Sequence, residues 1–415
     1  MYYQINGGKK LFGEVEIGGA KNCLLPLIAS SVAIDGIAEI DKCPPMTDVL
    51  NMIELLRRLG AKVEYGENRL QIDSRTINYV QVDENLSKKL RGSVLLLGAL
   101  LARFKRAVVP LSGGCAIGKR PIDIHISALK RLGVNVEEEN GKLYCDATNS
   151  KGNYVRLTYP SVGASENLIT FASLTKGTSV LDNVAMEPEV VSLEKFLVLA
   201  GAKISGVGSS RLEICGVEKL NSIFFSPIPD RIETATYLTA CLMTQGKITL
   251  RNTCPLHVKC LVDLLPFDVV TCCDDCICVQ TQRKIESFGK IVTGPYPMFA
   301  TDMQSLVLSL STVAMGQTLI FEKVFENRFS NCQELVKMGA KIDLFDDCAT
   351  IFGIDQLCGA DVKCSDLRSG AGLVLAGLNA KGTTRIFDVF HILRGYCDLA
   401  KNLNNLGAEI FEIKE

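Results

Sequence analysis

The chain has 415 residues, with 45 Lys and Arg against 46 Asp and Glu, which gives a formal net charge of -1 at pH 7. Its length predicts two domains or a long repeat, and the lack of basic excess argues against nucleic acid as the main partner. The 17 cysteines cannot all pair, because their number is odd. The N-terminus lacks the apolar segment of a secretory signal, so we expect reduced thiols in a cytoplasmic protein. The most apolar stretch, residues 93–102, is about half the ~20 residues of a membrane span, so we expect no membrane association.

A short sequence typical of a helix end followed by a strand recurs along the chain. It surrounds five glycines, separated by about 69 residues or by twice that distance: Gly60, Gly133, Gly201, Gly339 and Gly407. A sixth copy is expected near residue 270, where LLPFDVV lacks the glycine. Six repeats of about 69 residues therefore fill the chain.

Each repeat has the same predicted elements in the same order. An almost wholly apolar helix is expected in the six repeats at residues 22–33, 92–104, 166–174, 232–244, 303–315 and 371–379. A short strand and a more polar, amphipathic helix follow, with clear examples of that helix at 49–61, 126–134 and 190–202. Turn residues then indicate β-hairpins, for example around 65–72, 137–145, 206–214 and 344–352. Helices that are apolar on all sides are buried, which predicts two α/β lobes, each with three repeats around three buried helices and with a cleft between the lobes.

Polar and charged residues gather where each apolar helix begins. They are, in chain order, Lys21 and Asn22, Arg91, Ser161 to Gly163, Asp230 and Arg231, Asp302, and Asp366 with Arg368. A helix N-terminus favours anions, and arginine can hold a phosphate or carboxylate through two hydrogen bonds. Any one of these residues could be a helix cap. Their recurrence in the repeats favours anion binding.

The second repeat contains extra residues in the glycine-rich segment 110–123, PLSGGCAIGKRPID. Lys119 and Arg120 lie close to Cys115 in this segment. Neighbouring cations lower the pKa of a cysteine and increase its thiolate fraction. We interpret the segment as a lid that carries a reactive thiol.

Eight motifs in this order resemble the enolpyruvyl transferase family from Gly7 to the C-terminus: GGAKN, LSGGCAIGKRPIDIH, PSVGASEN, PDRIETATY, FATDMQ, FENRF, DLRSGAGLVLAG and RGY. The resemblance implies a two-lobed inside-out α/β barrel, with 21–229 as one lobe, 1–20 and 230–415 as the other, and the active site in the cleft between them. It implies transfer of the enolpyruvyl group of phosphoenolpyruvate to the 3-hydroxyl of UDP-N-acetylglucosamine, with release of phosphate, as the first committed step of peptidoglycan synthesis. No metal or organic cofactor is expected.

The resemblance also assigns roles to individual residues. It places phosphoenolpyruvate on Lys21, Arg120 and Arg394, within a cationic wall completed by Arg91, Arg328 and Arg368. Cys115 would donate a proton, form an adduct with phosphoenolpyruvate and react with the epoxide fosfomycin. Asp302 would take the proton of the sugar 3-hydroxyl, with Asn22 near the reacting centre and Asp366 orienting the catalytic groups. The uridine and its phosphates would contact Arg120, Pro121, Ile122, Asp123, Ile124, Ser161, Val162, Gly163 and Val324.

Some features leave alternatives open. Leu393 stands where the family usually has Asp, although no assigned catalytic residue is missing. Cys273 and Cys276 form a CxxC beside Cys272 and Cys278, for which a zinc site is one reading and a hairpin turning at Asp274 and Asp275 is the simpler one. Transfer to shikimate 3-phosphate and a non-catalytic regulatory paralogue are the two rival functions. The Cys115 segment argues against the first, and the retained catalytic set argues against the second.

Overall fold

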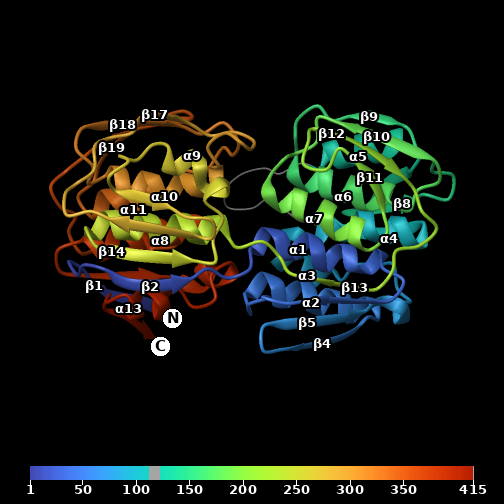
Figure 1. Ribbon diagram of the computed structural model, residues 1–415, viewed down its shortest axis with the longest axis horizontal. Coiled ribbons are helices and arrows are strands. Elements are labelled where there is room, and N and C mark those ends of the chain that lie inside the picture. The colour runs from blue at the N-terminus through green and yellow to red at the C-terminus, as the bar shows by residue number, and fades with distance from the viewer. Residues whose placement is uncertain (112–121, 415) are drawn as a thin grey trace. The chain divides into compact units, whose positions relative to one another are not determined.

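The computed structural model describes residues 1–111 and 122–414. These residues divide into two compact units. The middle unit comprises residues 19–111 and 122–228, and the terminal unit comprises residues 1–18 and 229–414. Both units are mixed α/β, with helices inside and strands around them (Figure 1).

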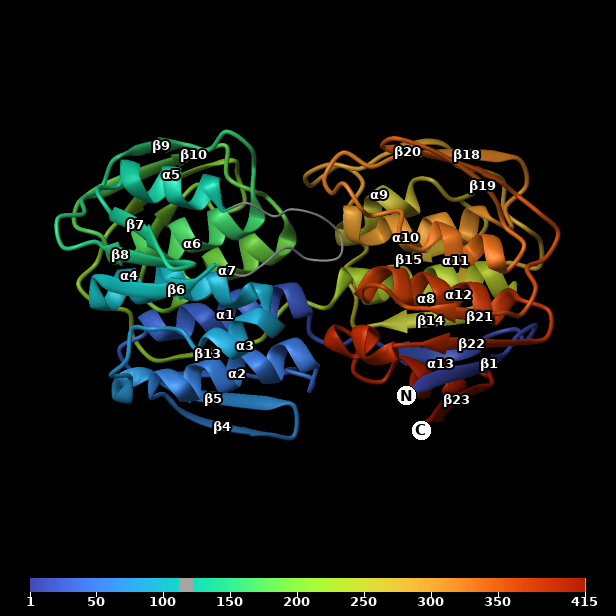
Figure 2. The same cartoon turned by 180° about the vertical axis from the view of Figure 1, so that it is seen from behind.

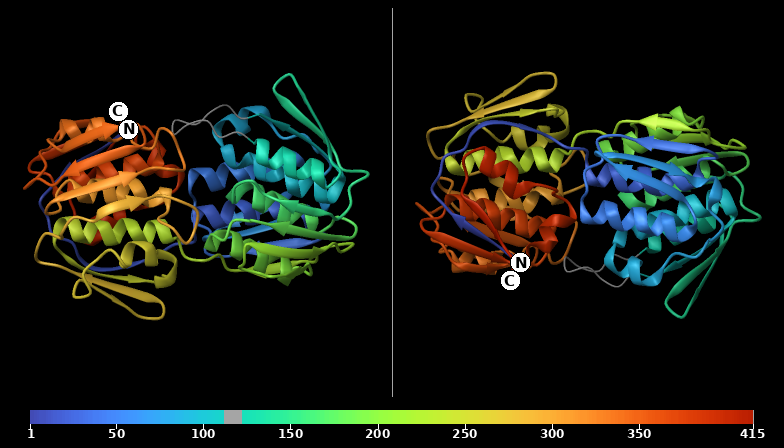
Figure 3. Two further views of the ribbon diagram at one scale, coloured as in Figure 1. Left: turned by 90° about the horizontal axis from the view of Figure 1, so that it is seen from above. Right: turned by 90° about the horizontal axis from the view of Figure 1, so that it is seen from below.

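Three buried helices form the centre of each unit (Figure 3). In the terminal unit they pack against one another and are α8 (Arg231–Thr244), α10 (Thr301–Ser311) and α12 (Leu367–Asn379). In the middle unit they are α1 (Lys21–Ser30), α4 (Leu96–Phe104) and α6 (Val162–Ala172). A 3₁₀ helix, η3 (Arg91–Leu95), leads into α4 and contacts both α1 and α6. The six predicted apolar helices are therefore confirmed.

Two of these helices begin before the apolar run that predicts them. Helix α6 begins at Val162 and α12 at Leu367, about one turn before the predicted starts at 166 and 371. The reason is helix capping, because the side chains of Ser161 and Asp366 accept hydrogen bonds from N–H groups of the first turn. The caps place polar side chains at the starts of buried helices.

Each repeat contributes one sheet, and six sheets are present in the described residues. In the middle unit the strand orders are β13 (Ile223–Phe225)–β3 (Ile37–Ile40)–β5 (Arg69–Asp73)–β4 (Lys62–Gly66), then β6 (Arg106–Pro110)–β8 (Lys142–Asp146)–β7 (Asn135–Glu139), and β9 (Tyr154–Arg156)–β10 (Thr178–Asp182)–β12 (Arg211–Cys215)–β11 (Lys203–Ser205). In the terminal unit they are β2 (Phe12–Glu16)–β14 (Lys247–Arg251)–β16 (Cys276–Gln280)–β15 (Val270–Cys272), then β17 (Gly289–Val292)–β18 (Gln317–Phe321)–β20 (Cys348–Phe352)–β19 (Lys341–Phe345), and β21 (Asp361–Lys363)–β22 (Thr383–Phe387)–β1 (Tyr2–Asn6)–β23 (Ile410–Ile413). The predicted hairpins are confirmed by the β4–β5, β7–β8, β11–β12 and β19–β20 pairs.

The N-terminal segment completes two sheets of the terminal unit. Strand β1 lies between β22 and β23 and pairs antiparallel with both, so that Tyr3 is opposite Ile386 and Glu412 (Figure 2). Strand β2 pairs parallel with β14. In the sixth repeat β1 therefore takes the place of the second hairpin strand of the other repeats, and the two ends of the chain share one sheet.

The outer helices are α2 (Thr47–Leu59), α5 (Asp123–Arg131), α7 (Pro188–Leu199), α11 (Cys332–Lys337) and α13 (Leu399–Asn405). The recurring glycines follow them with φ between 84° and 107°, a conformation that favours glycine at a helix C-terminus. The fourth repeat lacks this glycine, and its helix α9 (Lys259–Val262) is a single turn. The remaining short helices are η1 (Ser31–Ala33), η2 (Ser74–Thr76), α3 (Glu84–Lys89), η4 (Pro255–Val258) and η5 (Val389–Arg394). None of the helices in the described residues is long and apolar enough to cross a bilayer.

Candidate active site

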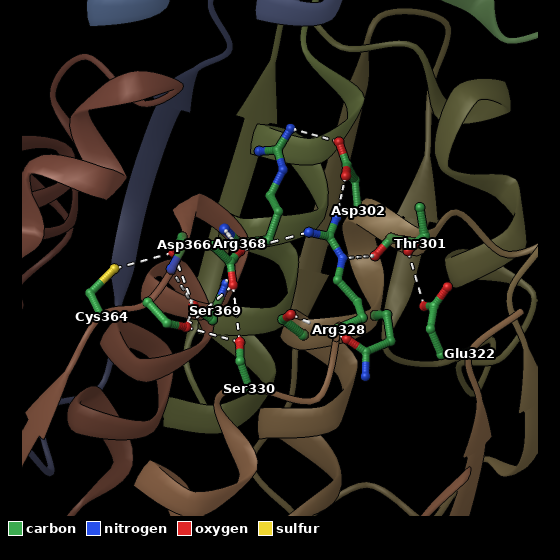
Figure 4. Close-up of polar contacts among 12 residues, drawn as sticks. Thr301, Asp302, Glu322, Arg328, Ser330, Cys364, Asp366, Arg368 and Ser369 are labelled. Atoms are coloured by element: carbon green, nitrogen blue, oxygen red, sulfur yellow. Dashed lines mark hydrogen bonds and ion pairs between the residues drawn. The ribbon is translucent and has the colours of Figure 1, made fainter. Parts of the chain in front are cut away.

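In the terminal unit, two arginines hold the carboxylate of Asp302 (Figure 4). Asp302 lies in the first turn of the buried helix α10. Its Oδ2 accepts a hydrogen bond of 3.0 Å from Nη2 of Arg368, which lies in the first turn of α12. Its Oδ1 accepts one from Nη2 of Arg328. The side chains of the two arginines are 2% and 3% exposed, whereas that of Asp302 is 24% exposed. The carboxylate is thus fixed by buried partners and remains accessible itself.

Arg328 also binds the groups that surround Asp302. Its Nε donates to the carbonyl oxygen of Thr301 at 3.3 Å, and its Nη1 lies 3.7 Å from Oδ1 of Asp366. The hydroxyl of Thr301 donates to Glu322 at 3.0 Å. The other oxygen of Glu322 accepts the backbone N–H of Val324 at 2.8 Å. These contacts connect the start of α10 to the chain around Val324.

Asp366 is the N-cap of α12 and is buried. Its Oδ1 accepts the N–H groups of Arg368 and Ser369 at 2.9 and 3.2 Å, and its Oδ2 accepts the hydroxyl of Ser330 at 3.1 Å. The Ser369 hydroxyl in turn accepts the N–H of Asp366, which completes a capping box. Asp366 therefore fixes the backbone that carries Arg368.

Arg368 has a second polar partner in the terminal unit. Its Nη1 lies 3.4 Å from the Tyr396 hydroxyl, which is 2.7 Å from the Thr236 hydroxyl of α8. Burial disfavours the charge of Arg368, but the Asp302 carboxylate raises its pKa above the usual value. Burial also raises the pKa of Tyr396. Tyr396 is therefore a neutral partner for a charged guanidinium.

The middle unit carries a second cationic position at a helix start. Lys21 is the first residue of α1, and its Nζ lies 3.4 Å from Oδ2 of Asp48 on α2. The side chains of Lys21 and Asp48 are 12% and 3% exposed. Asn22 follows on α1, and Arg91 begins η3. Because η3 contacts α1, the helix starts that carry Lys21, Asn22 and Arg91 lie together in this unit.

His125 of α5 is buried beside the start of α6. Its Nδ1 lies 2.9 Å from Nδ2 of Asn167, while Oδ1 of Asn167 accepts the N–H of Gly98 at 2.6 Å. A Cβ added to Gly163 would lie 3.4 Å from Cε1 of His125. Burial and the charge of Arg91 lower the pKa of His125 to about 4. His125 is therefore a neutral, structural histidine at this site.

The depressed pKa of His125 predicts acid sensitivity. In the unfolded chain its pKa returns to about 6.5, so this part of the stability is complete above pH 6.5 and is lost as pH falls through 4. The loss amounts to about 3 kcal/mol in the free energy of unfolding. We expect an NMR titration of the His125 ring to give a pKa near 4, and His125→Asn to remove this part of the pH dependence. A ring that titrates near 6.5 would contradict the prediction.

The predicted site residues fall into three groups. Asp302, Arg328, Asp366 and Arg368 are brought together in the terminal unit by the contacts above. That unit also carries Val324 and Arg394, the latter at the end of η5. Lys21, Asn22, Arg91, Ile122, Asp123, Ile124 and Ser161 to Gly163 belong to the middle unit, where Asp123 begins α5 and Ser161 caps α6. Cys115, Lys119, Arg120 and Pro121 lie outside the described residues.

Several residues of these networks were not predicted. Asp48, Glu322, Asn167 and Tyr396 each contact a predicted residue or its helix. Asp48 carries a weak signal, as an acidic residue in the first turn of a polar helix. Glu322 carries another, because it directly follows the apolar strand β18. Asn167 and Tyr396 lie within apolar or mixed segments and carry no such signal.

Comparisons with known proteins agree on one family. A family model described as EPSP synthase (3-phosphoshikimate 1-carboxyvinyltransferase) matches residues 5–403. The chain is 41% identical over 416 residues to UDP-N-acetylglucosamine 1-carboxyvinyltransferase 2 of Caldanaerobacter subterraneus subsp. tengcongensis, covering 99% of both chains. It is 42% identical to UDP-N-acetylglucosamine 1-carboxyvinyltransferase 1 of Legionella pneumophila, covering 98% of this chain and 82% of that one. The crystal structure of the enolpyruvyl transferase NikO from Streptomyces tendae has the same fold, with a TM-score of 0.88 at 24% identity over 99% of this chain and 98% of that one.

Proposed function

The chain belongs to the enolpyruvyl transferase family, and on that premise we propose that it transfers the enolpyruvyl group of phosphoenolpyruvate to the 3-hydroxyl of UDP-N-acetylglucosamine and releases phosphate. The observation that carries the proposal is the naming of relatives with 41% and 42% identity, aligned over nearly the whole chain, for this acceptor. The arrangement of charged side chains at the helix starts supports it.

We assign the activation of the acceptor to Asp302. Its accessible carboxylate would take the proton of the sugar 3-hydroxyl while the oxygen attacks the central carbon of phosphoenolpyruvate. Arg328 and Arg368 would hold the carboxylate in one orientation, which reduces the entropy cost of reaching the reactive geometry. Asp366 would act through Arg368, because it fixes the backbone that carries this arginine.

We assign the donor substrate to the cationic residues. Lys21, Arg120 and Arg394 would bind the phosphate and carboxylate of phosphoenolpyruvate, with Arg91 nearby. Cys115 would protonate the terminal carbon of the double bond and can form a covalent adduct with the donor. Loss of phosphate and of a proton from that carbon then restores the double bond in the product. Asn22 would hydrogen-bond near the reacting centre.

We further propose that the substrates bind between two lobes formed by 21–229 and by 1–20 with 230–415. The uridine and its phosphates would contact Arg120 to Ile124, Ser161 to Gly163, and Val324. A closed, cationic site would stabilise the several negative charges of the two substrates. The reaction would proceed without a metal or organic cofactor, in the cytoplasm, as the first committed step of peptidoglycan synthesis, and fosfomycin would inhibit it by alkylating Cys115.

Phosphate release with different acceptors tests this proposal. The enzyme is incubated with phosphoenolpyruvate alone, with UDP-N-acetylglucosamine, and with shikimate 3-phosphate. We expect phosphate release only with the nucleotide sugar. Release only with shikimate 3-phosphate would establish the rival acceptor. No release with either acceptor would favour a non-catalytic paralogue.

A further inference from the structure

Four cysteines gather on one hairpin of the terminal unit, away from the residues assigned to catalysis. Strands β15 and β16 form the hairpin, and their register places Thr271 opposite Cys278 and Cys272 opposite Ile277. The next residues towards the turn, Cys273 and Cys276, are joined by a backbone hydrogen bond of 2.9 Å from the N–H of Cys273 to the oxygen of Cys276. This confirms the predicted hairpin that turns at Asp274 and Asp275.

The Cys273 and Cys276 side chains lie next to each other. A hydrogen bond between the two thiols and burial raise the pKa of Cys276 to about 11, and the charges of Cys273, Cys278 and Asp275 add to the effect. Residues that face each other as a hydrogen-bonded antiparallel pair have Cα atoms about 5.5 Å apart, which lies within the range of about 4.4–6.8 Å found in disulfides. The hairpin therefore holds the two thiols where a disulfide can form without moving the strands.

The pair is accessible from solvent. Cys273, Asp274 and Asp275 are exposed and Cys276 is half-buried. Cys278 points to the same face of β16 as Cys276, since side chains two residues apart share a face. An open groove of about 590 Å³ runs along this part of the sheet and is lined by Thr249, Thr271 and Cys278, among others. A small molecule can therefore approach the sulfurs from this face.

The strand behind the pair is fixed. Cys276 is opposite Arg251 of β14, and the guanidinium of Arg251 makes hydrogen bonds of 2.5 and 2.8 Å to the carboxylate of Glu14 on β2. The hairpin is thus the outer part of a four-stranded sheet whose register is set by strands from distant parts of the chain. Oxidation of the pair changes the turn and leaves the sheet intact.

From this geometry we propose that Cys273 and Cys276 are a redox site that forms a reversible disulfide with a low-molecular-weight disulfide as the oxidant. The thiolate of Cys273 attacks one sulfur of the small disulfide and expels the other as a thiol, which leaves a mixed disulfide on Cys273. Cys276 then loses its proton and attacks Sγ of Cys273, releasing the second small thiol. Two protein thiols are oxidised and one small disulfide is reduced to two thiols, so atoms and electrons balance.

A metal site is the other chemistry that clustered thiols suggest. In the described residues, no group of three or more His, Cys, Asp or Glu side chains is arranged to hold a metal ion. The two central thiols instead contact each other directly. The arrangement favours a two-electron thiol–disulfide exchange.

Peptide mapping after oxidation tests the proposal. The full-length protein is treated with oxidised glutathione, denatured in N-ethylmaleimide and digested with trypsin, which releases residues 260–283 as one peptide. We expect this peptide to carry a disulfide between Cys273 and Cys276, with the maleimide on Cys260, Cys272 and Cys278. Dithiothreitol should restore alkylation of both cysteines.

Two sets of variants locate the bond. The matched control Cys272→Ser/Cys278→Ser should keep the disulfide. Cys273→Ser and Cys276→Ser should each lose it and leave a glutathione adduct on the remaining cysteine of the pair. A bond that joins Cys272 to Cys278, or Cys272 to Cys273, would overturn the proposal. Complete alkylation of all five cysteines after treatment would overturn it as well.

Discussion

Replacing Asp302 with asparagine is expected to lower kcat by about 10²- to 10⁴-fold, the usual contribution of a general base. The amide keeps the shape of the side chain, so contacts with Arg328 and Arg368 survive in part, but it cannot accept the proton of the 3-hydroxyl. The KM for UDP-N-acetylglucosamine should change much less than kcat. Steady-state kinetics of the purified variant with both substrates measures the effect.

Asp343→Asn provides the matched control for this prediction. Asp343 lies exposed on β19 of the same unit, and it has no assigned part in the reaction. Its replacement removes the same charge and should leave kcat and KM unchanged. Equal kcat values for Asp302→Asn and Asp343→Asn would show that Asp302 is not the base.

Replacing Arg328 with methionine is expected to lower the free energy of unfolding by about 3–5 kcal/mol, the usual cost of breaking a buried ion pair. Arg328 is 2% exposed and lies between Asp302 and Asp366. Its removal leaves two carboxylates close together, and Asp366 is itself buried. Urea unfolding measures the loss of stability, and activity should fall with it because Asp302 is no longer held in place.

Arg283→Met is the corresponding control for stability. Arg283 forms an ion pair of 2.8 Å with Asp268, but its side chain is 67% exposed. An exposed pair contributes about 0–1 kcal/mol, so this variant should unfold close to the wild type. If both variants lost the same small amount of stability, the Asp302–Arg328–Asp366 contacts would not form the buried network described above.

The repeated architecture could be predicted because it depends on local patterns. The apolar helices, the hairpin turns and the recurring glycines each have a periodicity or a backbone requirement that is visible in the sequence. The positive φ of Gly60 after α2 is an example. The helix starts were less accurate, because the caps Ser161 and Asp366 extend α6 and α12 beyond their apolar runs.

Pairing between distant strands could not be read from local patterns. The position of β1 between β22 and β23 joins residues near 3 to residues near 386 and 412. No turn sequence fixes that register. The one-turn helix α9 in the fourth repeat is explained in part by the missing glycine, which removes the usual helix end.

The charged centres of the site were predicted better than their partners. Lys21, Asp302, Arg328, Asp366 and Arg368 stand out through motifs and helix starts. Asp48 and Glu322 act through contacts with Lys21 and with the chain around Thr301 and Val324, and such contacts depend on the packing of separate elements. A buried amide such as Asn167 is recognised only when its three polar contacts are seen together.

The chemical structure of the product tests the central proposal most directly. The enzyme is incubated with ¹³C-labelled phosphoenolpyruvate and UDP-N-acetylglucosamine, and the product is analysed by NMR and mass spectrometry. We predict one new compound, with the labelled enolpyruvyl group joined by an ether bond to O3 of the sugar. Attachment at another oxygen, or an unchanged nucleotide sugar in a sample that converts shikimate 3-phosphate, would contradict the proposed function.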